Sequence, residues 1–195
     1  MESAEALLKI FISLFIVMVP FASLPAFLKL TKSSHWKDRS RAADKAVVVS
    51  ALVLLLCTAF GPWVLSAIGV SLDSFRIAGG VMLFLIATQF VLGISFAKEE
   101  HEKLDVALVL IAVPLITGPG AITTAILLST TPGIGVELVL AGITLVSVAN
   151  WILFRFAEQI HNRIGQQGEE VVTRLMGLLL GSIAVEFIRK GWLGA

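Results

Sequence analysis

Six hydrophobic runs, each about as long as a bilayer is thick, constrain this chain more than any other feature. A helix that crosses the hydrocarbon core needs roughly 20 apolar residues. The runs cover residues 6–30, 43–68, 74–96, 106–129, 136–156 and 171–188. They are too long for the strands of a membrane barrel, and no alternating pattern is evident. The sequence therefore predicts an all-α membrane protein with six transmembrane helices.

The composition agrees with this prediction and excludes several other classes. Of the residues, 57% are hydrophobic and 15% are charged, whereas soluble domains carry about 25% charged residues. The net charge of +1 indicates no nucleic-acid partner. The chain has one cysteine, Cys57, and its three histidines lack metal-ligand spacing. We therefore expect the lipid bilayer as a partner, and no metal and no cofactor.

Two of the runs carry the same interruption. Residues 20–25 read Pro-Phe-Ala-Ser-Leu-Pro and residues 114–119 read Pro-Leu-Ile-Thr-Gly-Pro, 94 residues later, with a hydroxyl side chain, Ser23 or Thr117, at the same place. Proline lacks a backbone N–H and clashes with the preceding turn, so the helix opens there. Helices 1 and 4 are therefore predicted to be broken at mid-membrane. Matched broken helices in two halves of a chain point to the binding site of a secondary transporter.

A second pair of segments supports two related halves. Residues 76–79 read Arg-Ile-Ala-Gly in helix 3, and residues 174–177 read Arg-Leu-Met-Gly in helix 6. Each half has three helices, an odd number, so the second copy must be inverted in the membrane. The sequence predicts a 3+3 inverted-topology repeat, with residues 1–98 as the first unit and 99–195 as the second. The alternative is that these segments resemble one another by chance, because membrane helices are built from few, mostly apolar, residue types.

Basic residues near the helix ends predict the orientation. With six spans, the connections between helices 1 and 2, 3 and 4, and 5 and 6 lie on one side and hold eleven basic residues; the other side holds four. The eleven are Lys29, Lys32, Lys37, Arg39, Arg41, Lys45, Lys98, Lys103, Arg155, Arg163 and Arg174, and the four are Lys9, Arg76, Arg189 and Lys190. We expect these three connections in the cytoplasm and both termini outside.

The two breaks suit a zwitterion. Half-helices that begin near Pro25 and near Pro119 offer N–H groups to a carboxylate, and half-helices that end near Val19 and Val113 offer carbonyl groups to an ammonium group. The predicted substrate-binding residues are Val19, Pro20, Ala22, Ser23, Leu24, Pro25, Thr117, Gly118, Pro119, Gly120 and Thr123. The alternative for Ser23 and Thr117 is a hydroxyl bonded to its own helix.

Three further polar residues lie inside the runs. Gln89 and Asn150 either line the pathway or bond across helices, and Glu186 is either a proton site or a partner of Arg189 and Lys190 at the interface. The pairs Gly79-Gly80 and Gly177/Gly181 indicate close helix packing rather than ligand contact. The sequence shows no Ser/His/Asp set and no His-Glu metal motif, so no enzymatic activity is expected.

At these residues the chain resembles the MarC family of bacterial and archaeal inner-membrane proteins. The resemblance rests on residues 20–27, 75–80, 114–124 and 174–178 and covers essentially the whole chain. It implies transport of small neutral amino acids of the glycine, alanine and serine type across the cell membrane by alternating access, with proton or sodium coupling. The alternatives are a passive channel and an efflux protein for small polar solutes.

One residue departs from the family pattern. The family usually places Asn or Asp directly before the first proline, and here that residue is Val19. Val19 is either a natural difference or a substitution at the site, and its apolar side chain weakens the expectation of ion coupling.

Overall fold

The computed structural model describes residues 2–31, 36–93 and 117–194. These residues form seven helical segments and no strand. The segments are α1 (Glu2–Met18), α2 (Pro20–Leu30), α3 (Trp36–Ala67), α4 (Leu72–Leu92), α6 (Pro119–Ser129), α7 (Val136–Arg155) and α8 (Ala157–Leu193). Among them, five stretches are long and apolar enough to cross a membrane: Ala4–Leu24, Arg39–Ala67, Leu72–Leu92, Val136–Arg155 and Ala157–Leu193. The prediction of an all-α membrane protein is confirmed.

Local sequence fixes several helix ends. The Ser71 hydroxyl accepts a hydrogen bond from the Ser74 amide at 3.1 Å and caps the start of α4. Gly93 ends α4 with φ 69°, a left-handed conformation that glycine adopts without strain. Pro119 stands in the first turn of α6, where no amide hydrogen is needed.

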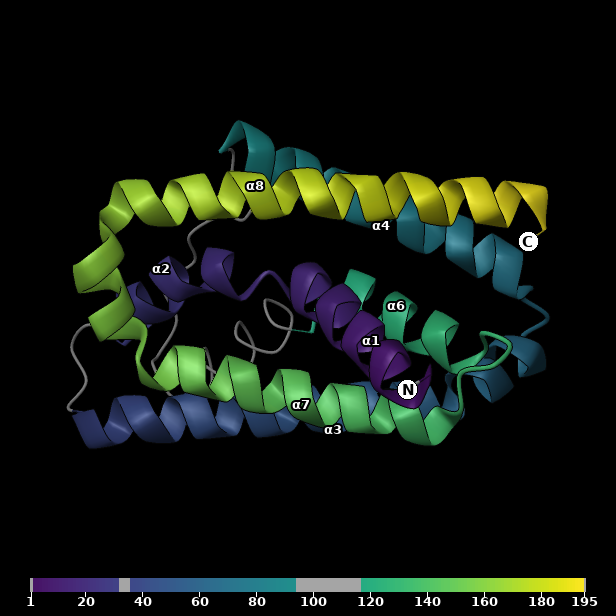
Figure 1. Ribbon diagram of the computed structural model, residues 1–195, viewed down its shortest axis with the longest axis horizontal. Helices are drawn as coiled ribbons and strands as arrows, with labels where there is room; N and C mark the ends of the chain where they lie inside the picture. Colours follow the sequence, from purple (N-terminus) through teal and green to yellow (C-terminus); the bar gives the residue numbers. More distant parts are fainter. Residues whose placement is uncertain (1, 32–35, 94–116, 195) are drawn as a thin grey trace.

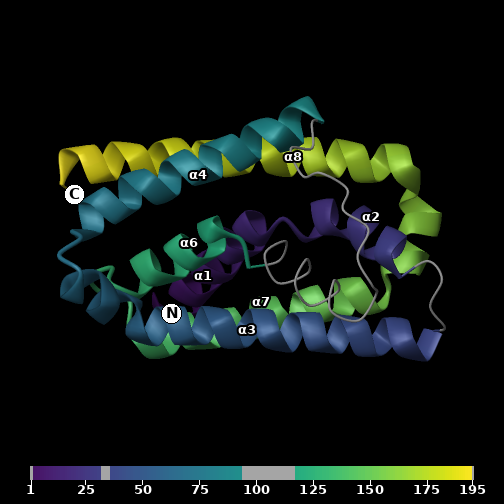
Figure 2. The same cartoon turned by 180° about the vertical axis from the view of Figure 1, so that it is seen from behind.

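The helices form two long pairs with shorter segments between them (Figures 1 and 2). One pair is α4 with α8, and the other is α3 with α7, while α1, α2 and α6 lie between the pairs in both views. The α4–α8 pair is antiparallel, because Gly191 contacts Ile77 near the start of α4 and Gly177 contacts Phe90 near its end. The α3–α7 pair is antiparallel as well, since Trp151 Nε1 donates to Asp44 Oδ1 at 2.6 Å.

Glycines let α4 approach its neighbours, as the sequence indicated. A Cβ atom on Gly80 would lie 2.8 Å from both the Ala184 carbonyl oxygen and Ile188 Cγ1. A Cβ atom on Gly79 would overlap the Thr123 side chain of α6. Small residues at such contacts are the usual means by which membrane helices pack closely. α4 is therefore held tightly on two sides, by α8 and by α6.

The largest correction to the predicted elements concerns residues 161–168, which we expected to form a polar connection. The segment α8 instead begins at Ala157, and this stretch is helical on both sides of Gly165, whose non-helical φ 71° and ψ 168° place a kink between two helices. The stretch includes the good helix formers Arg163, Gln166 and Gln167, and Ile160 just before it packs against the buried core. This amphipathic turn of helix is polar on one side, which made its sequence resemble a loop.

Other boundaries shift less. α3 begins at Trp36 rather than at residue 43, and its added turns are held by an ion pair between Arg39 and Glu158 at 2.6 Å. α4 ends at Leu92, and residues 94–96 lie outside the described residues. The same holds for the first part of the predicted run 106–129, of which the structure describes the helix from Pro119 onward. The membrane orientation stays a prediction.

Candidate functional site

The junction between α1 and α2 is the most irregular backbone among the described residues. α1 ends at Met18, α2 begins at Pro20, and Val19 between them has φ 40°. A positive φ is rare for a β-branched residue and costs about 1–3 kcal/mol unless the surroundings enforce it. The Val19 amide bonds to the Ile16 carbonyl at 3.2 Å, and Pro20 has no amide to continue the regular pattern.

This junction is buried inside the protein. Met18 and Val19 are each 3% exposed, and Leu24 in α2 is fully buried. Irregular backbone at membrane depth is tolerated only where protein covers it or where it lines a cavity. The junction meets that condition, because α1 packs against both α6 and α7.

Helix α7 brings polar side chains to the junction. Asn150 is fully buried, and its Nδ2 lies 3.4 Å from Met18 Sδ, while its Oδ1 has no hydrogen-bond partner within residues 2–31, 36–93 and 117–194. Gly142, two turns earlier, faces Ile10 of α1, so the two helices run side by side toward the break. Ser147 lies about one turn before Asn150 and its buried hydroxyl has no partner either.

Helix α6 brings its N-terminus to the same place. A Cβ atom on Gly120 would lie 3.3 Å from Val17 Cγ1 and would overlap Leu83 Cδ2, so the first turn of α6 packs on the end of α1. Gly118 is the N-cap, and no side chain caps this helix. The start of α6 therefore meets the end of α1. The matching break predicted in the fourth run begins outside the described residues, so the pair of mid-membrane breaks stays a prediction.

Thr123 in α6 and Thr117 just before it, both predicted binding residues, differ in their hydrogen bonding. Thr117 is 3% exposed and its Oγ1 is buried without a partner. Thr123 donates its hydroxyl to the Pro119 carbonyl at 2.8 Å, so it bonds to its own helix. The alternative of a helix-bonded hydroxyl that we raised for Ser23 and Thr117 stays open, because the residues one turn before Thr117 lie outside the described part of the chain. The missing side chain of Gly120 makes room for Leu83, so this glycine serves packing.

The remaining predicted residues lie at varied distances from the junction. Ser23 is buried and Ala22 half-buried in α2. Pro25 stands inside α2, not at the start of a half-helix as we expected, because Pro20 takes the first helical position directly after Val19. The predicted break residues 113–116 lie outside the described part of the chain.

Two other candidates are away from the junction. Gln89 is half-buried near the end of α4, where its carbonyl accepts the Gly93 amide. Glu186 is exposed and binds Arg189 at 2.7 Å and Lys190 at 3.5 Å, which is the interfacial pairing that the sequence indicated. Sequence reasoning missed Ser147 and Ser50, both buried with unpartnered hydroxyls, since a serine in an apolar run gives no sign of which face it occupies.

Charge is distributed at the ends of the molecule rather than at the junction. The ion pairs among described residues include Arg39 with Glu158 and Arg155 with Asp44 at one end, and Glu186 with Arg189 at the other. Others join Arg76 to Asp73, His161 to Glu169, Arg174 to Glu170 and Lys190 to Glu186, and none of these pairs includes a residue of the junction itself. The junction thus offers neutral polar atoms and helix termini to a ligand.

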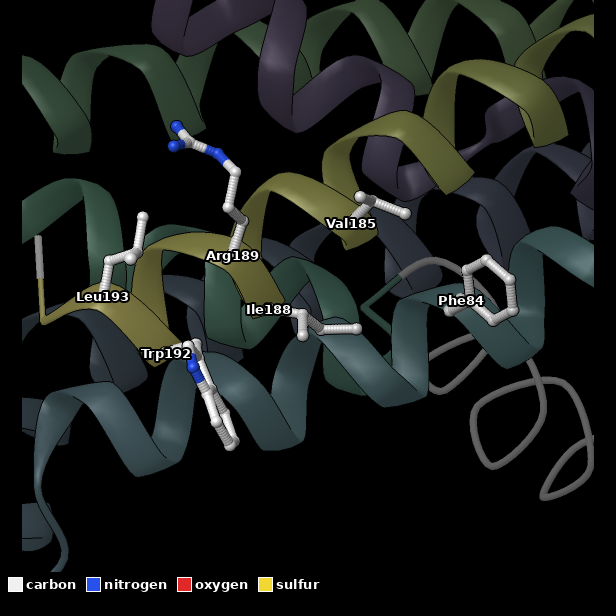
Figure 3. A pocket seen from close by; sticks show the side chains of 6 residues that line it. All are labelled: Phe84, Val185, Ile188, Arg189, Trp192 and Leu193. Atoms are coloured by element: carbon white, nitrogen blue, oxygen red, sulfur yellow. The ribbon is translucent and has the colours of Figure 1, made fainter.

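A separate groove lies on the outside of the α4–α8 pair (Figure 3). It has a volume of about 520 Å³. Its lining residues are Phe84, Val185, Ile188, Arg189, Trp192 and Leu193. In Figure 3 the Arg189 side chain points away from the Trp192 ring, so the groove itself is apolar. Exposed apolar side chains on a spanning helix meet acyl chains, and this groove therefore does not resemble a site for a polar solute.

Comparison with known proteins identifies the family. The profile described as "MarC family integral membrane protein" matches residues 4–195. The chain belongs to the MarC family. A similar relative is the UPF0056 membrane protein MJ1677 of Methanocaldococcus jannaschii, 37% identical over 194 residues and 95% of both chains.

Two further relatives of this MarC chain span bacteria and archaea. The UPF0056 membrane protein YvbG of Bacillus subtilis is 33% identical over 196 residues, covering 95% of this chain and 93% of YvbG. The UPF0056 membrane protein PYRAB13050 of Pyrococcus abyssi is 31% identical over 199 residues, covering 100% and 98%. These names describe membrane proteins and no substrate. No solved structure matches this chain.

Proposed function

We propose that this MarC protein is a secondary transporter of small neutral amino acids that works by alternating access. The observation that carries the proposal is Asn150 beside the strained helix junction: its Nδ2 lies 3.4 Å from Met18 Sδ, and its Oδ1 has no hydrogen-bond partner among the described residues. The buried hydroxyl oxygens of Ser147 and Thr117 also have no partner within the described part of the chain. An unsatisfied buried polar group costs about 1–3 kcal/mol, and native proteins keep few of them without a role. A polar ligand that binds at the junction would supply the missing hydrogen bonds.

The geometry fits a zwitterion with a small side chain. The carbonyl end of α1 at Met18 is attractive to an ammonium group, and the N-termini of α6 and α2 are attractive to a carboxylate. Asn150 Oδ1 adds an acceptor for the ammonium group. Val17, Leu83 and other apolar side chains line the surroundings, which favours glycine, alanine or serine over a charged or bulky substrate.

Contacts between α4 and α8 support an inverted repeat. Arg76 of α4 corresponds to Arg174 of α8, and Gly93, the C-cap of α4, corresponds to Gly191 of α8. Both pairs are 98 positions apart in the sequence. A Cβ atom on Gly93 would lie 3.8 Å from Arg174 Nη2, and one on Gly191 would lie 2.7 Å from Ile77 Cγ1, directly after Arg76. In an inverted repeat, a two-fold axis in the membrane plane would relate these two ends to one another. Rocking of one repeat against the other is the alternating-access motion that such a fold allows.

The test is an exchange assay with purified protein in liposomes. Vesicles are loaded with unlabelled alanine, and the entry of labelled alanine is followed. We expect saturable exchange that glycine and serine compete for and that glutamate and leucine do not. A folded protein that gives no exchange contradicts the proposal, and flux without saturation or counter-flow identifies the passive channel instead.

A matched pair of variants locates the site. Thr117→Val removes the unpartnered hydroxyl, and Thr124→Val removes a buried hydroxyl that already bonds to the Gly120 carbonyl at 2.8 Å. Loss of one hydrogen bond to the ligand is worth about 1 kcal/mol, so the half-saturating alanine concentration should rise several-fold for Thr117→Val only. Equal effects of the two changes would contradict this assignment. The proposal is for a carrier and not for an enzyme.

A further inference from the structure

A buried carboxylate lies away from the junction, on α8. Glu169 is 2% exposed, its Oε2 lies 3.1 Å from His161 Nδ1, and its Oε1 has no hydrogen-bond partner among the residues that the structure describes. The His161 side chain is 42% exposed. A buried carboxylate is costly unless it is paired or protonated. The half-exposed imidazole of His161 thus lies between the buried carboxyl group of Glu169 and the solvent.

The bend in α8 creates this pair. His161 and Glu169 are eight positions apart, which in a straight helix corresponds to about 12 Å along the axis. Gly165 stands between them with φ 71° and ψ 168°, a conformation that residues with side chains rarely adopt. The bend turns the first part of α8 back toward the rest of the helix and brings the two side chains together. In Figure 1 this bend lies at the same end of the molecule as α2.

The other described charged side chains near this end have partners of their own. Arg39 of α3 binds Glu158 at 2.6 Å and the Thr31 carbonyl at 3.3 Å. Arg155 of α7 lies 4.0 Å from Asp44. On α8, the exposed Glu170 lies 3.9 Å from Arg174, and Arg163 is exposed.

The remaining helices that pack on α8 add no described charge at this place. α4 carries Asp73 and Arg76 beside the opposite end of α8, where Gly191 contacts Asp73. α1 carries Glu5 and Lys9 before the junction. The side chain of Lys29 in α2 lies outside the described ones. On α3, Arg41 and Lys45 are also charged and exposed. The contact that the structure shows between Glu169 and an ionisable side chain is the one with His161.

We propose that Glu169 binds the proton that drives transport and that His161 exchanges this proton with the aqueous phase. The inference rests on the proposed function and specifies its coupling ion. In the loading step, a water proton binds to Nε2 of the neutral imidazole while the Nδ1 proton moves to Oε2 of Glu169. The carboxylate becomes a neutral acid, and the imidazole stays neutral with its proton on Nε2. Ring rotation or tautomer exchange then resets the histidine.

The position of Glu169 connects this proton to the substrate site. α8 packs on α2, and α2 begins at Pro20 of the junction. An ionised carboxylate in a buried place favours an arrangement that hydrates or pairs it, whereas a protonated carboxyl group has a much smaller need for such contacts. The two protonation states therefore favour different packings of α8 on α2. An imposed pH gradient would bias the alternation between them.

The experiment uses the full chain in liposomes with two readouts. One is alanine-for-alanine exchange without a gradient, and the other is net accumulation of alanine under an imposed pH gradient. We compare the wild type with Glu169→Gln and with Glu170→Gln, a neighbouring exposed carboxylate as the matched control. Glu169→Gln should lose gradient-driven accumulation and keep exchange. Glu170→Gln should match the wild type in both readouts.

The possible outcomes distinguish a failure of the proton assignment from a failure of the proposed transport function. A wild type that exchanges alanine but ignores the pH gradient, or that follows only a sodium gradient, overturns the proton assignment and leaves the transporter intact. Undiminished accumulation by Glu169→Gln also overturns it. A folded wild type without exchange contradicts the transporter itself.

A second variant covers the case in which Glu169→Gln does not fold. His161→Gln changes a half-exposed side chain, keeps hydrogen-bonding capacity and cannot carry a proton at this position. It should slow gradient-driven accumulation and leave exchange unchanged. Accumulation at the wild-type rate in this variant contradicts the relay.

Discussion

The α4–α8 pair and the α1–α2 junction solve the same problem, that of placing backbone and polar groups in a membrane, in opposite ways. In the pair, α4 is regular from end to end and its hydroxyls bond locally, with Thr88 donating to the Phe84 carbonyl at 2.8 Å and Ser182 of α8 to Leu178 at 3.1 Å. At the junction, the helix stops at a strained valine and buried polar atoms have no partners.

This difference indicates that the α4–α8 pair is the scaffold and that the α1–α2 junction is the candidate binding site. A region whose hydrogen bonds are complete has nothing to offer a polar ligand. A region with unsatisfied buried atoms gains free energy when a ligand completes them. The predictions below test this division, beginning with the largest expected effect.

Asn150→Leu should abolish alanine exchange. Leucine has the same branching as asparagine and no polar atoms, so it removes the unpartnered Oδ1 without leaving a large cavity. Because replacing an unsatisfied polar group by an apolar one is nearly neutral or stabilising, thermal unfolding in detergent should be unchanged or shifted upward. The control is Thr144→Val, at an exposed residue of the same helix whose hydroxyl bonds to Leu140. Retained exchange with reduced stability would mean that Asn150 is structural.

Gly80→Ala should destabilise the fold without a specific effect on the site. Its Cβ would lie 2.8 Å from the Ala184 carbonyl oxygen, and overpacking of this kind costs about 1–3 kcal/mol. Gly181→Ala is the control, because its Cβ would lie 3.6 Å from Ala87 Cβ, an ordinary contact. Thermal unfolding should separate the two. Equal stability would show that the α4–α8 pair is looser than its geometry indicates.

Val19→Asn should be tolerated where Val17→Asn is not. Asparagine adopts positive φ more readily than valine, so relief of strain of about 1–3 kcal/mol offsets the burial of an amide. Val17 is equally apolar and 8% exposed, but it lies inside α1. An amide there should cost about 1–3 kcal/mol with nothing to offset it. The midpoint of thermal unfolding checks both, and similar losses would argue against strain at Val19.

Glu186→Gln should have the smallest effect. Glu186 is exposed and bound to Arg189 at 2.7 Å, so its loss removes a surface ion pair of small value. Exchange and its dependence on a pH gradient should both match the wild type. A change in the gradient dependence would move the proton site from Glu169 to Glu186.

Much of the fold followed from the sequence because long apolar runs have few alternatives in a bilayer. The break before Pro20 was predicted for the same reason, since proline removes an amide whatever surrounds it. The start of α2 was misplaced at Pro25, because two prolines five positions apart both fit the first turn of a helix, and only the packing of Val19 selects one. Residues 161–168 were misread because a polar helix and a polar loop share a composition.

The sequence by itself determined the class of this protein and the places of the five spanning segments found among the described residues, because these depend on local hydrophobicity and on backbone chemistry. The tertiary structure alone decided which polar atoms are left without partners. Asn150 and Thr144 look alike in an apolar run, yet one faces Met18 inside the protein and the other is exposed. Glu169 is hidden by a bend at Gly165 that brings it to His161. Whether a polar atom has a hydrogen-bond partner depends on its neighbours in space, and these are fixed only when distant segments of the chain pack together.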